Sequence, residues 1–196
     1  MISTEEAKNI VVSTLAIALA LSIASEGLGI LSQPGKLVYL ISLFAITVGI
    51  GFVLHELAHK VVAIRFGGQA EFRMWIQGLV LALLFSVFGF VFVSPGAVYI
   101  YAPKVTKQQN GLISLAGPLT NMALSLVFLA IAAVFPMNMA LPLGYGSVWL
   151  FASKINVWLG LFNMIPIFPL DGSKVFDWNV AVWAAFSLLF VFLFIY

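Results

Sequence analysis

The segment LVYLISLFAITVGIGFVLHELAHKVVAIRF, residues 37–66, decides the fold of this chain. Its apolar length exceeds the ~20 residues that cross a bilayer as a helix, yet its second half carries His55, Glu56 and His59. The chain has 196 residues, of which 63% are hydrophobic and 8% charged, whereas roughly a quarter of a soluble domain is charged. We therefore expect an all-α polytopic membrane protein, and we exclude a soluble enzyme, a disordered chain and a nucleic-acid binder.

Further apolar segments lie on both sides of this stretch, and connections that contain Pro and Gly separate them. They cover residues 9–25, 76–93, 112–135, 147–168 and 178–196, while residues 67–73 are expected to form a polar turn. Residues 9–25 are interpreted as a retained membrane span, because two acids precede them where a signal peptide carries bases. Neither a repeat nor a soluble domain is evident, so the sequence predicts a single membrane-embedded domain over residues 1–196.

The apolar run at residues 76–93 is at the lower length limit for a membrane span, which leaves the number of crossings at five or six. Six crossings would divide the Lys and Arg residues five to four between the two sides, whereas five crossings divide them seven to two. Lys and Arg accumulate in cytoplasmic loops. The charges thus favour five crossings, with residues 76–93 as a re-entrant or hairpin element, although a plain transmembrane helix stays open as the alternative.

The charged stretch His55-Glu56-Leu57-Ala58-His59 has the pattern H-E-x-x-H. Because four residues make about one helical turn, both imidazoles can reach one Zn²⁺, and Glu56 lies close enough to take a proton from metal-bound water. The alternative is that these groups only hydrogen-bond within a helix bundle. That alternative is weak, because three polar groups in a lipid-embedded helix would each need a partner.

A hydrolytic zinc site needs a third protein ligand and an open position, and this chain has no cysteine and no third histidine. The candidate is Asp171 in NMIPIFPLDG, residues 163–172, where two prolines prevent a regular helix and Gly172 frees the backbone. An ordinary Asp-Gly turn at the membrane surface stays open as its alternative. The other acids lie at span ends, in the polar turn or at the start of the last apolar run: Glu5, Glu6, Glu26, Glu71 and Asp177.

A further motif is GPLTN at residues 117–121. Pro118 lacks an N–H and disturbs a helix, and Asn121 offers a donor and an acceptor one turn later. A kinked helix with a packing asparagine is the plain alternative. With five crossings, however, this motif, the H-E-x-x-H pair and Asp171 all come to a similar depth near the inner face.

Three motifs, in their order along the chain, resemble those of the site-2 protease family of intramembrane zinc metalloproteases. They are HELAH, GPLTN and the N-x-x-P-x-x-PLDG of residues 163–172. The resemblance covers about residues 37–176, a catalytic core of three helices. It implies that His55, His59 and Asp171 bind one Zn²⁺ and that Glu56 is the general base. It also gives Asn121 and Asn163 supporting roles near the substrate or oxyanion. Within a re-entrant or membrane-associated segment of about residues 72–103, it likens the Pro-Gly segment near Pro95 to a membrane-associated β element that pairs with an unwound substrate.

The resemblance implies an endopeptidase that hydrolyses peptide bonds in or near transmembrane segments of its substrates. We then expect a multi-pass membrane protein whose active site lies nearer the cytoplasmic side, and whose partners are a transmembrane protein substrate and the lipid bilayer. The PDZ and C-terminal regulatory domains of many relatives are not found in this sequence. Two other classes stay open: a membrane metal transporter, which needs further ligands along a path, and an inactive homologue that binds transmembrane helices without cutting them.

Overall fold

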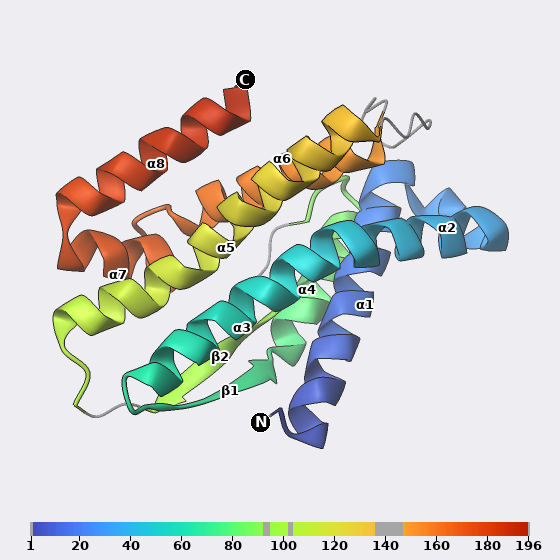
Figure 1. Ribbon diagram of the computed structural model, residues 1–196. Helices are drawn as coiled ribbons and strands as arrows, with labels where there is room; N and C mark the ends of the chain where they lie inside the picture. The colour runs from blue at the N-terminus through green and yellow to red at the C-terminus, as the bar shows by residue number, and fades with distance from the viewer. Residues whose placement is uncertain (1, 92–94, 102–103, 136–146, 196) are drawn as a thin grey trace.

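The computed structural model describes residues 2–91, 95–101, 104–135 and 147–195. Within these residues the regular secondary structure is helical apart from a two-stranded ribbon of β1 (Gln69–Met74) and β2 (Gly96–Tyr101) (Figure 1). A 3-10 turn (Leu28–Ser32) and a π-helical turn (Ala45–Gly49) interrupt the helices. The helices are α1 (Thr4–Glu26), α2 (Pro34–Phe44), α3 (Ile50–Arg65), α4 (Ile76–Ser86), α5 (Lys107–Val134), α6 (Val148–Asn163), α7 (Asp171–Trp178) and α8 (Val180–Ile195).

The long helix expected over residues 37–66 is confirmed, with one irregular turn inside it. α2, the π-helical turn and α3 follow one another directly and form one helical segment, Pro34–Arg65. Pro34 lies in the first turn of α2, where the missing N–H of proline costs no helical hydrogen bond. The segment ends before Gly67, whose φ of 80° is in the left-handed region that glycine enters without strain.

Three neighbouring helices, α3, α5 and α6, form the centre of the molecule. α5 packs against both α3 and α6, and α7 and α8 cover the outer side of this group (Figure 1). One apolar cluster joins α1, α2 and the start of α6, and a second joins α5, α6, α7 and α8. In the second cluster the ring of Phe190 lies so close to Gly160 that a methyl group on Gly160 would collide with it. The expected three-helix core is thus present.

The chain between the two strands leaves the ribbon and returns to it. β1 and β2 are antiparallel, with Met74 opposite Gly96, and the N–H of Trp75 donates to the carbonyl of Pro95 at 3.1 Å. α5 therefore begins at the end of the bundle where α3 stops, and the two helices are antiparallel neighbours (Figure 1). The expected β-hairpin-like element is present, although residues 92–94 and 102–103 of it lie outside the described residues.

One expected boundary was wrong. Residues 67–73 were expected to be a polar turn, but β1 begins at Gln69, because it pairs with a strand that is remote in sequence. In the apolar run 147–168, α6 ends at Asn163. The irregular segment expected around Pro166 and Pro169 follows it, because proline interrupts helices.

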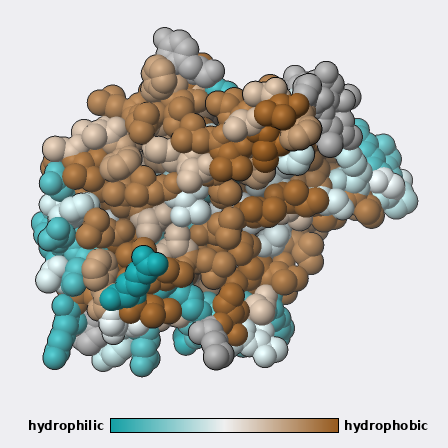
Figure 2. Space-filling view, in the orientation of Figure 1, coloured by the Kyte–Doolittle hydropathy of each residue, from teal (hydrophilic) through white to brown (hydrophobic). Residues whose placement is uncertain are grey.

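The surface of the helices is apolar. Among the described residues, three helical segments are long and apolar enough to cross a membrane: Thr4–Glu26, Pro34–Arg65 and Lys107–Val134. α4 and α8 are apolar but shorter. Figure 2 shows a broad hydrophobic face over the helices, with hydrophilic residues gathered at the end that carries the ribbon and at the opposite end.

Candidate metal centre

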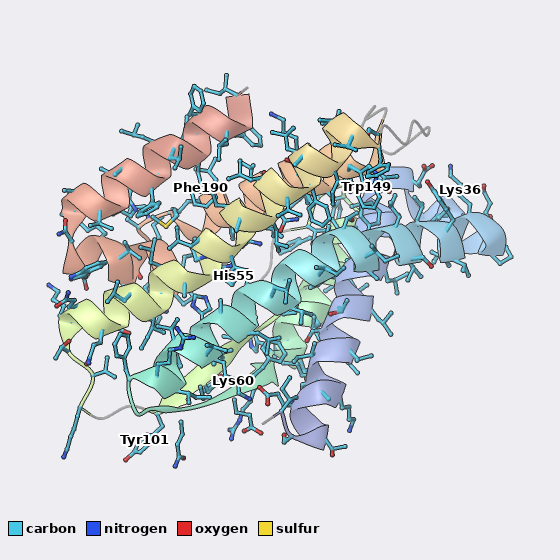
Figure 3. All side chains as sticks on the ribbon, in the orientation of Figure 1. Lys36, His55, Lys60, Tyr101, Trp149 and Phe190 are labelled. Atoms are coloured by element: carbon cyan, nitrogen blue, oxygen red, sulfur yellow. The ribbon has the colours of Figure 1, made fainter. Side chains whose placement is uncertain are left out.

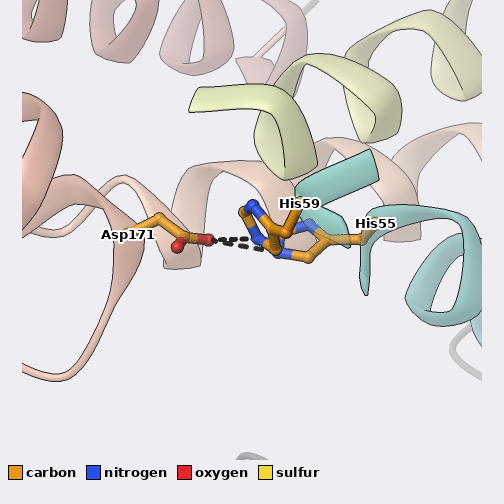
Figure 4. A group of neighbouring side chains, drawn as sticks. All are labelled: His55, His59 and Asp171. Atoms are coloured by element: carbon orange, nitrogen blue, oxygen red, sulfur yellow. Dashed lines mark hydrogen bonds and ion pairs between the residues drawn. The ribbon is translucent and has the colours of Figure 1, made fainter. Parts of the chain in front are cut away.

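His55 and His59 lie one turn apart on α3 and point toward the same place. Their buried rings are nearly perpendicular, with centroids 4.6 Å apart. Nε2 of each imidazole lies 3.1 Å from Oδ2 of Asp171, the first residue of α7 (Figure 4). Three ligand atoms from two separate elements therefore converge in the core.

An irregular segment between α6 and α7 brings Asp171 to this place. It contains the two prolines of the motif, and the indole Nε1–H of Trp183 on α8 donates to the carbonyl of Met164 at 2.7 Å. Gly172 packs tightly against this segment, because a Cβ at that position would collide with the backbone of Met164. The expectation that an unwound segment would aim Asp171 into the bundle is thus confirmed.

Backbone carbonyls fix the tautomers of both histidines. Nδ1 of His59 lies 2.7 Å from the carbonyl oxygen of Ile113. A carbonyl only accepts hydrogen bonds, so this Nδ1 carries the proton. Nδ1 of His55 lies 2.6 Å from Oδ1 of Asn121, whose Nδ2 donates to the carbonyl of Gly51 at 3.2 Å. The orientation of Asn121 is therefore fixed, and Nδ1 of His55 also carries its proton.

The two free Nε2 lone pairs and the carboxylate oxygen of Asp171 form a donor set that suits a cation. Three electron-pair donors so close together repel one another unless a positive charge lies between them. A tetrahedral Zn²⁺ with bonds of about 2.0–2.1 Å would hold its ligand atoms roughly 3.3 Å apart, close to the 3.1 Å found here. Gly117 of α5 keeps the space open, because a Cβ there would lie 2.5 Å from both Nε2 atoms. The group fits one metal ion.

Glu56 lies beside this group and lines a cavity of about 440 Å³. The cavity wall is mostly apolar and is formed largely by side chains of α1, α3, α4 and α6, with His55 among the polar residues that line it. Figure 3 shows His55 in the interior of the helical body, with Lys60 closer to the ribbon. Oε2 of Glu56 accepts a hydrogen bond of 3.0 Å from the backbone N–H of Val98 in β2. The carboxylate therefore lies between the ligand group and the strand edge.

The two asparagines expected near the site have different surroundings. Asn121 is fully buried and supports His55 directly, while its expected contact with the substrate stays a prediction. Asn163, the last residue of α6, lines the cavity, and its Nδ2 donates to the carbonyl of Leu159 at 3.0 Å. Its role near the substrate also stays a prediction.

Two further contacts of the site, with the Val98 N–H and with the Ile113 carbonyl, could not be predicted from the sequence. Both are backbone groups, which carry no residue signature. The buried ion pair between Glu6 of α1 and Lys60 of α3 was also missed. Its lysine stands next to His59 in the sequence, which is the one signal that could have drawn attention to it.

Known proteins that resemble this chain are named as zinc metalloproteases. MJ0611 of Methanocaldococcus jannaschii, named as a candidate zinc metalloprotease, is 43% identical over 188 residues, or 95% of this chain and 91% of the relative. The chain belongs to the site-2 protease family. Two further relatives of this chain, also named as candidate zinc metalloproteases, are YwhC of Bacillus subtilis and Rip3 of Mycobacterium tuberculosis. YwhC is 29% identical over 67% of this chain and 66% of its own length. Rip3 is 36% identical over 62% of this chain and 26% of its own length.

No family model and no solved structure matches the chain. Zinc is the cofactor that the names of the relatives specify, and the buried group of His55, His59 and Asp171 in this chain fits it.

Proposed function

We propose that this protein is an intramembrane endopeptidase that cuts transmembrane protein substrates at the His55–His59–Asp171 centre. The observation that carries the proposal is that His55, His59 and Asp171 form one buried group, and that His55 and Glu56 also line an apolar cavity. Zinc, when bound, polarises the scissile carbonyl and lowers the pKa of a bound water. Glu56 would take the proton from that water and pass it to the leaving amine.

The arrangement of the helices supports five crossings and one membrane-embedded domain. α1, the α2–α3 segment, α5, α6 and α8 would each cross, while residues 75–95 would enter and return. Lys36 and Tyr101 lie at opposite ends of the molecule (Figure 3). Most of the bases would then face the cytoplasm, on the side of the ribbon and nearer to the metal centre: Lys8, Lys60, Arg65, Arg73, Lys104, Lys107 and Lys174.

The outer edge of β2 is a suitable place for the substrate backbone. Phe72 and Val98 are opposite each other in the ribbon, and their N–H groups point outward, to Glu6 and Glu56 respectively. A transmembrane helix satisfies its own backbone hydrogen bonds, so a substrate must unwind before it is cut. An unwound segment that pairs with β2 would bring a peptide bond beside Glu56, and the apolar cavity would take its side chains.

The test is cleavage of a membrane-spanning substrate by the purified protein in liposomes, with and without a zinc chelator. We expect cleavage that the chelator abolishes and that added Zn²⁺ restores. Zinc flux across the liposome membrane without cleavage would instead support a metal transporter. Binding of the substrate without cleavage, at full zinc occupancy, would support an inactive homologue.

A further inference from the structure

A row of buried polar side chains crosses the core from α6 to the metal centre. Nδ2 of Asn156 donates to the carbonyl of Ala152 at 2.8 Å, and Oδ1 of Asn156 accepts from Nδ2 of Asn121 at 3.0 Å. Oδ1 of Asn121 then accepts from Nδ1 of His55 at 2.6 Å. Both asparagines are 0% exposed, so water does not compete for these bonds.

The direction of this row is fixed at two points. The carbonyls of Ala152 and Gly51 can only accept, so each asparagine must turn its Nδ2 toward its own carbonyl. The carbonyl oxygen of Asn156 is then left for Asn121, and that of Asn121 is left for His55. Only the tautomer of His55 with a proton on Nδ1 completes the row, and that tautomer has its lone pair on Nε2, which faces His59 and Asp171.

Asn156 is held in this place by tight packing against α3. A Cβ on Gly51 would collide with Oδ1 of Asn156, so the close approach of the two helices depends on glycine at position 51. The neighbouring Ile155 and Leu159 line the cavity, whereas Asn156 is not among the lining residues. Asn156 thus reaches the metal centre through Asn121 and not through the substrate.

We propose that Asn156 is a positioning residue, which acts through Asn121 to hold His55 in the tautomer that binds zinc. Without the Asn156 oxygen, Nδ2 of Asn121 loses the shorter of its two hydrogen bonds, and only the 3.2 Å bond to the carbonyl of Gly51 then opposes a turn of the amide that presents an N–H to Nδ1 of His55. That orientation would favour the tautomer with its proton on Nε2, which cannot bind a metal. The proposal rests on His55 as a zinc ligand, and groups that orient metal-bound histidines typically change metal affinity 10- to 100-fold when they are removed.

The experiment measures zinc affinity, by competition with a chelating dye, and the ¹⁵N signals of the two histidines in the zinc-loaded protein. We expect Asn156→Leu, which keeps the branching of the side chain but removes both polar groups, to weaken zinc binding by about 10- to 100-fold. In the fraction of the protein where His55 no longer binds zinc, its proton should move from Nδ1 to Nε2, while His59 stays unchanged. Asn156→Thr should restore both properties, because a threonine hydroxyl can donate to the carbonyl four residues before it and still accept from Asn121.

Ser153→Ala is the matched control. Ser153 also lies buried on α6 and bonds to Ser125 of α5 at 2.9 Å, and it should leave zinc affinity and both tautomers unchanged. If Asn156→Leu prevents folding, Gly51→Ala provides a second route, because it displaces Asn156 without altering either asparagine. The proposal is overturned if a folded Asn156→Leu or Gly51→Ala protein keeps the parental affinity and tautomer, or if Ser153→Ala loses zinc to the same extent. Neither readout depends on protease activity, so the proposed function could fail while this inference holds.

Discussion

The backbone N–H of Val98 donates a hydrogen bond of 3.0 Å to Oε2 of Glu56. The expected general base is therefore bonded to the strand edge on which we propose that the substrate pairs. A substrate that takes up the Val98 N–H would release the Glu56 carboxylate next to the metal centre. Binding of an extended substrate backbone to β2 would then also free the carboxylate of Glu56 to act as the base.

This relationship predicts the effect of Val98→Pro, which removes the N–H and leaves the carbonyl. Loss of one backbone hydrogen bond to the substrate, worth about 1 kcal/mol, should lower kcat/KM roughly fivefold. Val98→Ala keeps the N–H and is the control for the loss of the side chain. Equal kcat/KM values for the two variants on a membrane-spanning substrate would contradict pairing at Val98.

Glu56→Gln should abolish most cleavage without releasing zinc. Glutamine still offers an oxygen to the Val98 N–H but cannot take a proton, and general bases typically contribute about 10²- to 10⁴-fold to a rate. The measurements are the initial rate of cleavage and the zinc content of the purified variant. A variant that cuts at the parental rate would rule out Glu56 as the base.

Asp171→Asn should reduce the zinc content from about one ion per chain to near zero, because a neutral amide is a poor replacement for a carboxylate ligand. Asp177→Asn is its control, since Asp177 is exposed on the same helix, α7. Metal analysis after purification checks both variants. Full zinc occupancy in the Asp171 variant would mean that another group supplies the third ligand.

The ligand group could be predicted from the sequence because its signals are local. His55 and His59 are one helical turn apart, and the prolines around Asp171 mark an unwound segment within a few residues of the acid. The hydrogen bond of Val98 could not be predicted, because the partner of Glu56 is a backbone group 42 residues away. β1 was missed for a similar reason, since a polar segment forms a strand only when its partner lies beside it.

The burial of Glu6 shows most clearly that the environment of a residue cannot be predicted from its position in the sequence alone. The sequence places it among charged residues at the start of an apolar run, yet it is 1% exposed and pairs with Lys60 of α3. Oε1 of the same carboxylate accepts from the N–H of Phe72 in β1 at 3.0 Å. One acid thus joins α1, the helix of the metal centre and the ribbon, and no local pattern indicates these distant partners.

Glu6→Gln should therefore destabilise the protein by roughly 3 kcal/mol, because it removes the carboxylate charge with which the buried Lys60 ammonium forms an ion pair. Glutamine keeps an acceptor for Phe72, so the effect isolates the charge. Glu5→Gln, at an exposed neighbouring position, should change little. Thermal unfolding in detergent compares the Tm values of the Glu6 and Glu5 variants. The double variant Glu6→Gln with Lys60→Met should recover part of the stability that Glu6→Gln loses. A Tm equal to that of the Glu5 variant would show that the pair is not needed.

The path of residues 75–95 can be tested by labelling, and the chain is well suited to it because it has no cysteine. Met74 lies opposite Gly96 in the ribbon, so Arg73 and Lys104 should face the same side of the membrane. Single-cysteine variants Arg73→Cys, Lys104→Cys and Lys36→Cys, treated with a membrane-impermeant maleimide in vesicles of known orientation, should label the first two from one side and Lys36→Cys from the other. If residues 76–93 cross instead, Lys104→Cys will label together with Lys36→Cys. That result would require the ribbon to open, because paired strands cannot have their ends on opposite sides of a bilayer whose core is ~30 Å thick.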